Sequence, residues 1–225
     1  MNAVRAIFIK QMNDLPRNVS ITLLFILYPA MSYIMGQVMG DVVPFVAMFT
    51  AMFVGSTPMI AMCNTVAEDR EYKSIRFLVI AGVKPLQYLF GLAIFAISMS
   101  LLPLSVFAYQ SGYTGVTLFH FFLITVSGCI VSAILGASIG IMSKNVQQAT
   151  AIYSPVMLLL ALMPPIAAVN ENIARIGEFI YSYQTFIFMF NPEAGINRPL
   201  LVIFANLAIL LIFFVAVYKK KGLRG

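Results

Sequence analysis

Residues 85–143 contain no Asp, Glu, Lys or Arg. This uncharged run is far longer than the roughly 20 residues that one helix needs to cross a hydrocarbon core about 30 Å thick. Its single turn-rich polar cluster is Gln110-Ser-Gly-Tyr-Thr-Gly115, and such a cluster indicates a break between two helices. The sequence therefore predicts a protein that crosses a membrane more than once.

Further uncharged runs lie on both sides of residues 85–143. Hydrophobic residues make up 61% of the chain and charged residues only 10%, and the mean hydropathy of +0.94 is far outside the range of soluble globular proteins. Too few polar residues remain for a separate soluble domain. We therefore predict an all-α polytopic membrane protein, with residues 1–225 forming a single transmembrane domain. The six expected transmembrane helices are residues 19–39, 42–67, 86–109, 116–142, 148–169 and 199–218.

Two segments outside the spans have their own patterns. Residues 1–16 place apolar side chains at helical spacing opposite basic ones, which predicts a short helix in the headgroup layer; a frayed tail is the alternative. The next apolar run is long enough to span, so we expect a first transmembrane helix and no cleavable signal. Residues 170–198 mix charges with an aromatic run, 179–190, that is too short and too polar to cross. They predict short re-entrant or interfacial helices on the outer side.

The basic residues decide the orientation. Six spans put both termini on one side, and twelve of the fourteen Lys and Arg residues then fall on that same side. Only Arg175 and Arg198 fall on the other. Because Lys and Arg concentrate in cytoplasmic loops, we expect cytoplasmic termini. The net charge of +6 has the same explanation and does not indicate nucleic-acid binding. The twelve residues are Arg5, Lys10, Arg17, Arg70, Lys73, Arg76, Lys84, Lys144, Lys219, Lys220, Lys221 and Arg224.

The charged residues between the second and third spans crowd into residues 68–85. Tyr72, Ile75 and Val79 lie three and four residues apart, which predicts one apolar stripe on an otherwise charged helix of about residues 69–81. Gly82 is suited to end that helix. A helix of this kind either lies on lipid as a solvated loop or docks its stripe into a groove on a soluble partner.

The order of these elements resembles an ABC-2 type permease, the membrane subunit of an ATP-binding cassette exporter. Residues 67–78 (AEDREYKSIRFL), 82–85 (GVKP) and 88–91 (YLFG) are similar to the acidic start, the coupling helix and the proline-containing return of that family. Residues 143–149 (SKNVQQA) with the pair Pro164-Pro165 form a second match, and the outer segment that closes on Asn191-Pro192 forms a third. Together these segments extend over nearly the whole chain.

This resemblance implies an assembly of two permease subunits, identical or merely similar, above two copies of an ABC ATPase subunit. The chain contains no phosphate-binding loop G-x-x-x-x-G-K-[ST]. It would therefore be no enzyme itself and bind no cofactor, with ATP and Mg held by the partner ATPase. Small permeases of this kind imply a bacterial plasma membrane, with peptide export or self-protection against antimicrobial peptides as family-level expectations. The residues implied in ATPase coupling are Glu68, Asp69, Arg70, Glu71, Tyr72, Lys73, Ile75 and Arg76.

The spans contain features that bear on the mechanism. Gly128, Ser132, Gly136 and Gly140 follow one another at four-residue spacing, which predicts close helix packing within the chain; a subunit interface or a moving seam is the alternative. The expected spans contain no Asp, Glu, Lys or Arg, which argues against a transporter driven by an ion gradient. Fourteen Met and nineteen Phe residues suit an apolar path, or equally a lipid-facing surface.

These patterns lead to one main prediction and two alternatives. We expect the permease subunit of an ABC exporter that moves a hydrophobic or amphipathic substrate such as a peptide, a lipid or a drug. The first alternative is a membrane scaffold that recruits a soluble partner without transport, and the second is an ATP-independent channel. One histidine and two isolated cysteines provide no metal site.

Overall fold

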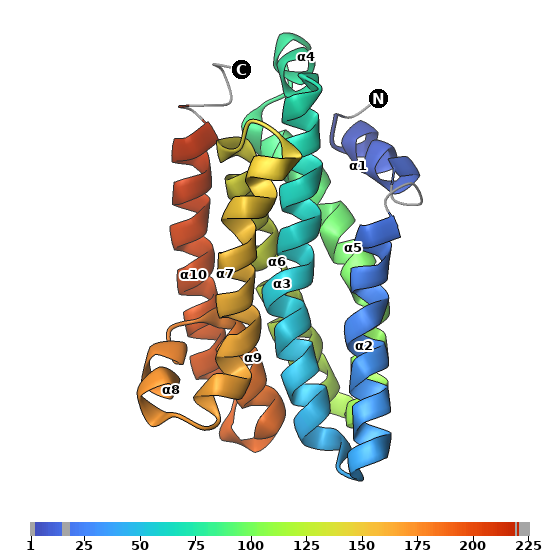
Figure 1. Cartoon of the computed structure of the whole chain (residues 1–225), viewed down its shortest axis with the longest axis vertical. Helices are drawn as coiled ribbons and strands as arrows, with labels where there is room; N and C mark the ends of the chain where they lie inside the picture. Colours follow the sequence, from blue (N-terminus) through green and yellow to red (C-terminus); the bar gives the residue numbers. More distant parts are fainter. Residues whose placement is uncertain (1–2, 15–18, 219, 221–225) are drawn as a thin grey trace.

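The fold is a bundle of helices whose longest members run side by side (Figure 1). The computed structural model describes residues 3–14, 19–218 and 220, and within them it leaves out the side chains of Ala3, Asp14, Ser20, Ile21, Arg76, Val79 and Pro85. The elements are α1 (Ala3–Asp14), α2 (Val19–Met39), α3 (Val42–Glu71), α4 (Ser74–Ile80), α5 (Pro85–Ser111), α6 (Gly115–Met142), α7 (Val146–Ala167), α8 (Glu171–Gly177), α9 (Tyr181–Phe190), the 3-10 turn η2 (Pro192–Ala194) and α10 (Asn197–Val217).

Six of these helices, α2, α3, α5, α6, α7 and α10, are long and apolar enough to cross a membrane. The length and composition of these helices confirm the prediction of an all-helical membrane protein with six candidate spans. The α5–α6 boundary also lies where the polar cluster predicted it. There Gly112 ends α5 with a φ of +66°, a left-handed conformation that costs glycine little because it has no Cβ atom.

Helix α3 forms the centre of the bundle. It packs against α2, α5, α6, α7 and α9, and most of its side chains are buried. Phe53, for example, is fully buried between Phe25 of α2 and Phe107 of α5, with ring centroids 5.9 Å away in each case. A movement of α3 would therefore affect nearly every other span.

The two ends of the bundle carry different elements. Helices α1 and α4 and the last turns of α10 lie at one end, the α4 end, whereas α8 and α9 lie at the other, the α9 end (Figure 1). Residues 170–198 do form short helices, as expected. However, α9 is largely buried, and Ser182 donates a hydrogen bond of 3.0 Å to the carbonyl oxygen of Leu160 in α7. Tyr181, Tyr183 and Phe188 of the aromatic run are thus part of the core, whereas Phe179 and Phe190 at its two ends are exposed.

The boundary between the second span and the charged helix differs from the prediction. We expected the span to end near residue 67 and a new helix to begin near Asp69. In the structure α3 continues without interruption through Glu71, and α4 comprises only Ser74–Ile80. The charged residues did not end α3 because its last carboxylates find partners on neighbouring helices.

Candidate functional site

The candidate site is the α4 end of the bundle, where α3 turns into α4. The amide of Tyr72 donates to the carbonyl oxygen of Glu68 at 2.9 Å, and the amide of Lys73 donates to that of Arg70 at 3.0 Å. Lys73 has a φ of +58°, which is left-handed and strained for a residue with a side chain. This one strained residue lets the chain leave α3 and begin α4 at Ser74.

Asp69, in the last turns of α3, is 3% exposed and has two partners. One carboxylate oxygen forms an ion pair with Lys10 of α1, and the other accepts a hydrogen bond of 2.8 Å from the hydroxyl of Tyr88 in α5. A buried carboxylate is costly unless it is paired and hydrogen-bonded. We call these three residues the Asp69 clasp. It joins α1, α3 and α5 at one point.

Apolar packing next to the clasp holds α1 in the same place. Ile7 is buried against α5, and a Cβ atom added to Gly91 would lie 2.8 Å from the Cβ of Ile7. Glycine at position 91 is therefore what allows α1 to approach α5 so closely. Lys10, one turn after Ile7, is positioned by this contact to reach Asp69.

Glu71 connects α3 to α7. Its carboxylate accepts a hydrogen bond of 3.1 Å from the amide of Val146, the first residue of α7. The N-terminus of a helix presents unpaired amides and a partial positive charge, so a carboxylate is favourable there. Asn145 caps the same helix by accepting from the amide of Gln148 at 2.8 Å. The end of α3 is thus connected to α1, α5 and α7.

Helix α4 has one side buried and one side exposed. Ile75 is only 6% exposed and packs into the apolar cluster that contains Ile7 and Tyr88. Tyr72, Phe77 and Ile80 are 76%, 69% and 74% exposed. We call these three residues the tip patch.

The structure corrects the predicted docking stripe. Ile75 was expected to face a soluble partner, but the turn at Lys73 rotates α4 so that this side chain points into the bundle. The side chains of Val79 and Arg76, also predicted in this region, lie outside the described residues. The spacing of Phe77 and Ile80, three residues apart, was a signal in the sequence for the exposed face that our prediction did not use.

Of the remaining residues predicted to couple to an ATPase, some are exposed to solvent and others are partly or fully buried in the bundle. Glu71, Tyr72 and Lys73 are exposed, whereas Glu68 and Arg70 are partly buried. Asp69 is instead occupied by the clasp. Nothing in the sequence indicated that Lys10 and Tyr88 are partners of Asp69, because both are far from it along the chain and only the fold brings the three together.

The small-residue stripe of α6 faces α3. A Cβ atom at Gly136 would overlap the carbonyl oxygen of Met59, and one at Gly140 would lie 2.8 Å from that of Cys63. At Gly128 the nearest atom, 2.6 Å away, belongs to the side chain of Val54. The backbones of α3 and α6 therefore approach closely along this stripe, as small residues allow. Within the described structure, α3 occupies this face of α6.

Ser132, the one residue of the stripe that is not glycine, belongs to a buried polar cluster. Its hydroxyl donates to the carbonyl oxygen of Val54 and lies 2.6 Å from the hydroxyl of Tyr181 in α9. Tyr181 also reaches the carbonyl oxygen of Gly55 at 3.4 Å. This cluster connects α3, α6 and α9. The contact between Ser132 and Tyr181 could not be predicted from the sequence, because no spacing pattern relates the two residues.

Comparison with protein-family models and with curated proteins gives no match for this chain. The resemblance to ABC-2 type permeases therefore stays a prediction from the sequence. Among the residues that the structure describes, no group of three or more His, Cys, Asp and Glu side chains is placed to hold a metal ion.

Proposed function

We propose that this chain is the membrane subunit of an ABC exporter, and that its α4 end docks a separate ATPase. The observation that supports this best is the tip patch. Three large apolar side chains, Tyr72, Phe77 and Ile80, are exposed beyond the end of the longest buried helix. Exposed aromatic anchors on a rigid base are typical of surfaces that bind another protein.

The connections of α3 suit a docking surface that must transmit force. A push on α4 acts on the end of α3, and the Asp69 clasp and Glu71 extend it to α1, α5 and α7. Rigid-body movement of packed helices is a common form of conformational switch. Because the sequence has no phosphate-binding loop, the ATPase in this proposal is another polypeptide that holds ATP and Mg.

The proposal includes an assembly, a location and a substrate class. Two such subunits, identical or merely similar, would pair in a bacterial plasma membrane with the α4 end in the cytoplasm and α8 and α9 re-entering from the outer side. Charged residues are few along the spans, and Met and Phe are plentiful. A transport path lined by such apolar side chains would favour a hydrophobic or amphipathic peptide, lipid or drug over a sugar or an ion.

Cysteine labelling tests the orientation. Lys73 at the α4 end and Asn172 in α8 are both exposed, and the two native thiols, Cys63 and Cys129, are buried, so background labelling is low. In intact cells we expect a membrane-impermeant maleimide to label Asn172→Cys. We expect it to label Lys73→Cys only after the membrane is opened. Labelling of Lys73→Cys in intact cells would reverse the orientation and remove the docking proposal.

Co-purification tests the docking itself. From membranes of the source cell in mild detergent, the chain is expected to retain a subunit with ATP-hydrolysing activity and a phosphate-binding loop. Tyr72→Asp with Phe77→Asp is expected to lower the retained ATPase activity at least about tenfold, because two aromatic anchors are lost and charges replace them. The measurements are phosphate release and mass spectrometry of the bound proteins.

A matched pair of changes at the other end provides the control. Ile176 and Phe179 are also large, exposed and apolar, but they lie in and just after α8. Ile176→Asp with Phe179→Asp is expected to retain the ATPase. Equal losses in both double variants, or no ATPase in the unmodified protein, would contradict the proposal. A tip-dependent partner without ATPase activity would favour a scaffold, and substrate movement without any ATPase would favour a channel.

A further inference from the structure

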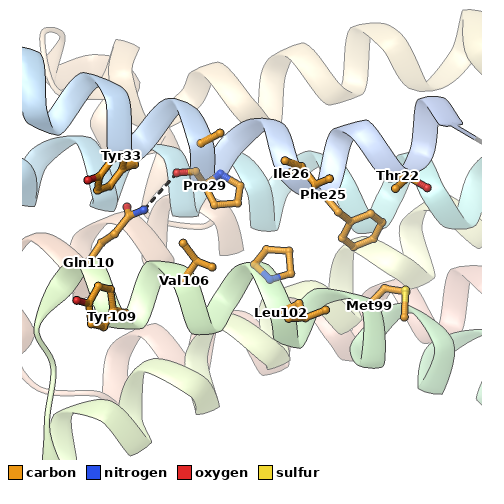
Figure 2. Close-up of a pocket in the computed structure, with 12 residues that line it drawn as sticks. Thr22, Phe25, Ile26, Pro29, Tyr33, Met99, Leu102, Val106, Tyr109 and Gln110 are labelled. Atoms are coloured by element: carbon orange, nitrogen blue, oxygen red, sulfur yellow. Dashed lines mark hydrogen bonds between the residues drawn. The ribbon is translucent and has the colours of Figure 1, made fainter.

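A groove of about 680 Å³ lies between α2 and α5, separate from the α4 end (Figure 2). Its floor is formed by buried Phe25, Pro29 and Pro103, and its rims include the exposed side chains of Ile26 and Leu102. Both helices are candidate membrane spans, so the open side of the groove faces the region that lipid chains occupy. Apart from Thr22, Tyr33, Tyr109 and Gln110, the lining residues are apolar.

The polar groups of the groove are concentrated at one end. The side-chain amide of Gln110 donates to the carbonyl oxygen of Pro29 at 3.2 Å (Figure 2), and its oxygen accepts from the hydroxyl of Ser32 at 2.7 Å. A glutamine amide has two N–H groups, and in the proposal below the second N–H of Gln110 is the donor to the ligand. The exposed hydroxyl-bearing side chains of Tyr33 and Tyr109 lie at the same end, where tyrosine commonly meets a headgroup layer.

The length of the groove matches one leaflet. It extends from Thr22 to Tyr33 on α2 and from Met99 to Gln110 on α5, which at 1.5 Å per residue is about 16 Å. This is roughly half of a hydrocarbon core about 30 Å thick. The polar end of the groove points toward the α9 end, close to the end of α5 at Ser111 and about two turns before the end of α2 at Met39.

The groove suits a flexible hydrocarbon chain, because its lining is apolar over most of a length of about 16 Å and its polar side chains gather at the Gln110 end. A second copy of this chain packed over the groove is the competing occupant, and the experiment below distinguishes the two.

We propose that the groove is a binding site for one acyl chain of a bilayer phospholipid. The hydrocarbon lies along the floor between α2 and α5, and the ester and headgroup oxygens accept hydrogen bonds at the Gln110 end. The polarity of the groove thus matches that of an amphipathic lipid over most of its length, and Thr22 is the one polar lining residue at the opposite end. The site depends only on α2 and α5 lying in a bilayer and is independent of the ATPase proposal.

Tryptophan fluorescence tests the site, because the native sequence contains no Trp. Leu102→Trp places the only indole at the rim of the groove. Ile209→Trp places it on the exposed side of α10, outside the groove, as the matched control. Each variant is purified in dodecyl maltoside micelles that receive increasing fractions of phosphatidylcholine brominated near the middle of its acyl chains, so that detergent is the competitor for the groove. Bromine quenches the indole when a chain lies against it.

Preferential binding is expected to shift the quenching curve. For Leu102→Trp, half-maximal quenching is expected at a phospholipid fraction roughly threefold lower than for Ile209→Trp, because the groove binds phospholipid more tightly than detergent, whereas the control position meets both in proportion to their amounts. Adding Ala30→Phe, which fills the groove, is expected to return the Leu102→Trp curve to that of the control. Coincident curves without Ala30→Phe would overturn the proposal. Weaker quenching at Leu102→Trp than at the control would also overturn it, because protein would then cover the groove.

Discussion

Lys10→Met is expected to lower the free energy of unfolding by about 2 kcal/mol. The change removes the cation from the Asp69 clasp and leaves the carboxylate buried with Tyr88 as its remaining partner. Removing one member of a fully buried pair costs about 3–5 kcal/mol, and the smaller figure applies here because Lys10 is about half exposed and water replaces part of the interaction. Methionine keeps the length and most of the apolar stem of lysine.

The buried native thiols provide the measurement. Cys63 and Cys129 react with a thiol-specific dye only when the bundle opens, so dye fluorescence on heating or in denaturant reports unfolding in detergent. The exposed Lys84 is the matched control, and Lys84→Met is expected to change stability little. A Lys10→Met variant as stable as the Lys84→Met variant would show that the clasp does not stabilise the fold.

A second substitution separates charge burial from loss of packing. Asp69→Asn in the Lys10→Met background removes the unpaired charge and is expected to restore most of the lost stability, because neutral groups cost less to bury. The two changes together should therefore cost less than the sum of the single changes. Simple additivity would mean that Lys10 and Asp69 act independently, contrary to the geometry of the clasp.

The spans were predictable because the bilayer fixes their length and composition. Residues 19–39 were expected to form the first span, and α2 is Val19–Met39. The break near Gln110–Gly115 was also predictable, since its glycines adopt conformations that other residues avoid. These features depend on local sequence and on the thickness of the hydrocarbon core, both of which can be read directly from the chain.

The end of α3 was not predictable, because it depends on contacts between distant segments. Acidic residues after an apolar run normally indicate that a helix has left the membrane. Asp69 stays in α3 because Lys10, far earlier in the chain, and Tyr88, in the following span, meet it there. No periodic pattern links these three positions. The sequence showed the charges but not their partners.

The orientation of α4 was missed for a similar reason. A single strained residue, Lys73, decides which face of a seven-residue helix points inward. The sequence analysis predicted one apolar stripe, through Tyr72, Ile75 and Val79, and did not use the second apolar pair, Phe77 and Ile80. The structure buries Ile75 and exposes that pair. Short helices carry too few residues for periodicity to decide between such alternatives.

Gly136→Leu is expected to prevent close packing of α3 on α6 and to destabilise the bundle by more than about 3 kcal/mol, beyond the usual range for overpacking. Even the first added atom, the Cβ, would overlap the backbone carbonyl oxygen of Met59. A backbone atom in the middle of the central helix cannot move without moving the other spans that α3 contacts. The dye assay on solubilised membranes measures the loss, together with the yield of folded protein.

Alanine substitutions keep this prediction testable where the leucine variant fails to fold. In an unobstructed helix, Gly→Ala stabilises by about 1 kcal/mol, so steric overlap must first overcome this gain. Gly136→Ala meets backbone and should destabilise most. Gly128→Ala meets a side-chain atom of buried Val54 at 2.6 Å and should also destabilise, but less, because a side chain can shift slightly without moving the backbone of α3. Gly36→Ala meets Val42 at 3.3 Å and should be nearly neutral. Any other order would mean that α3 and α6 are not held at the separation that this stripe of glycines allows.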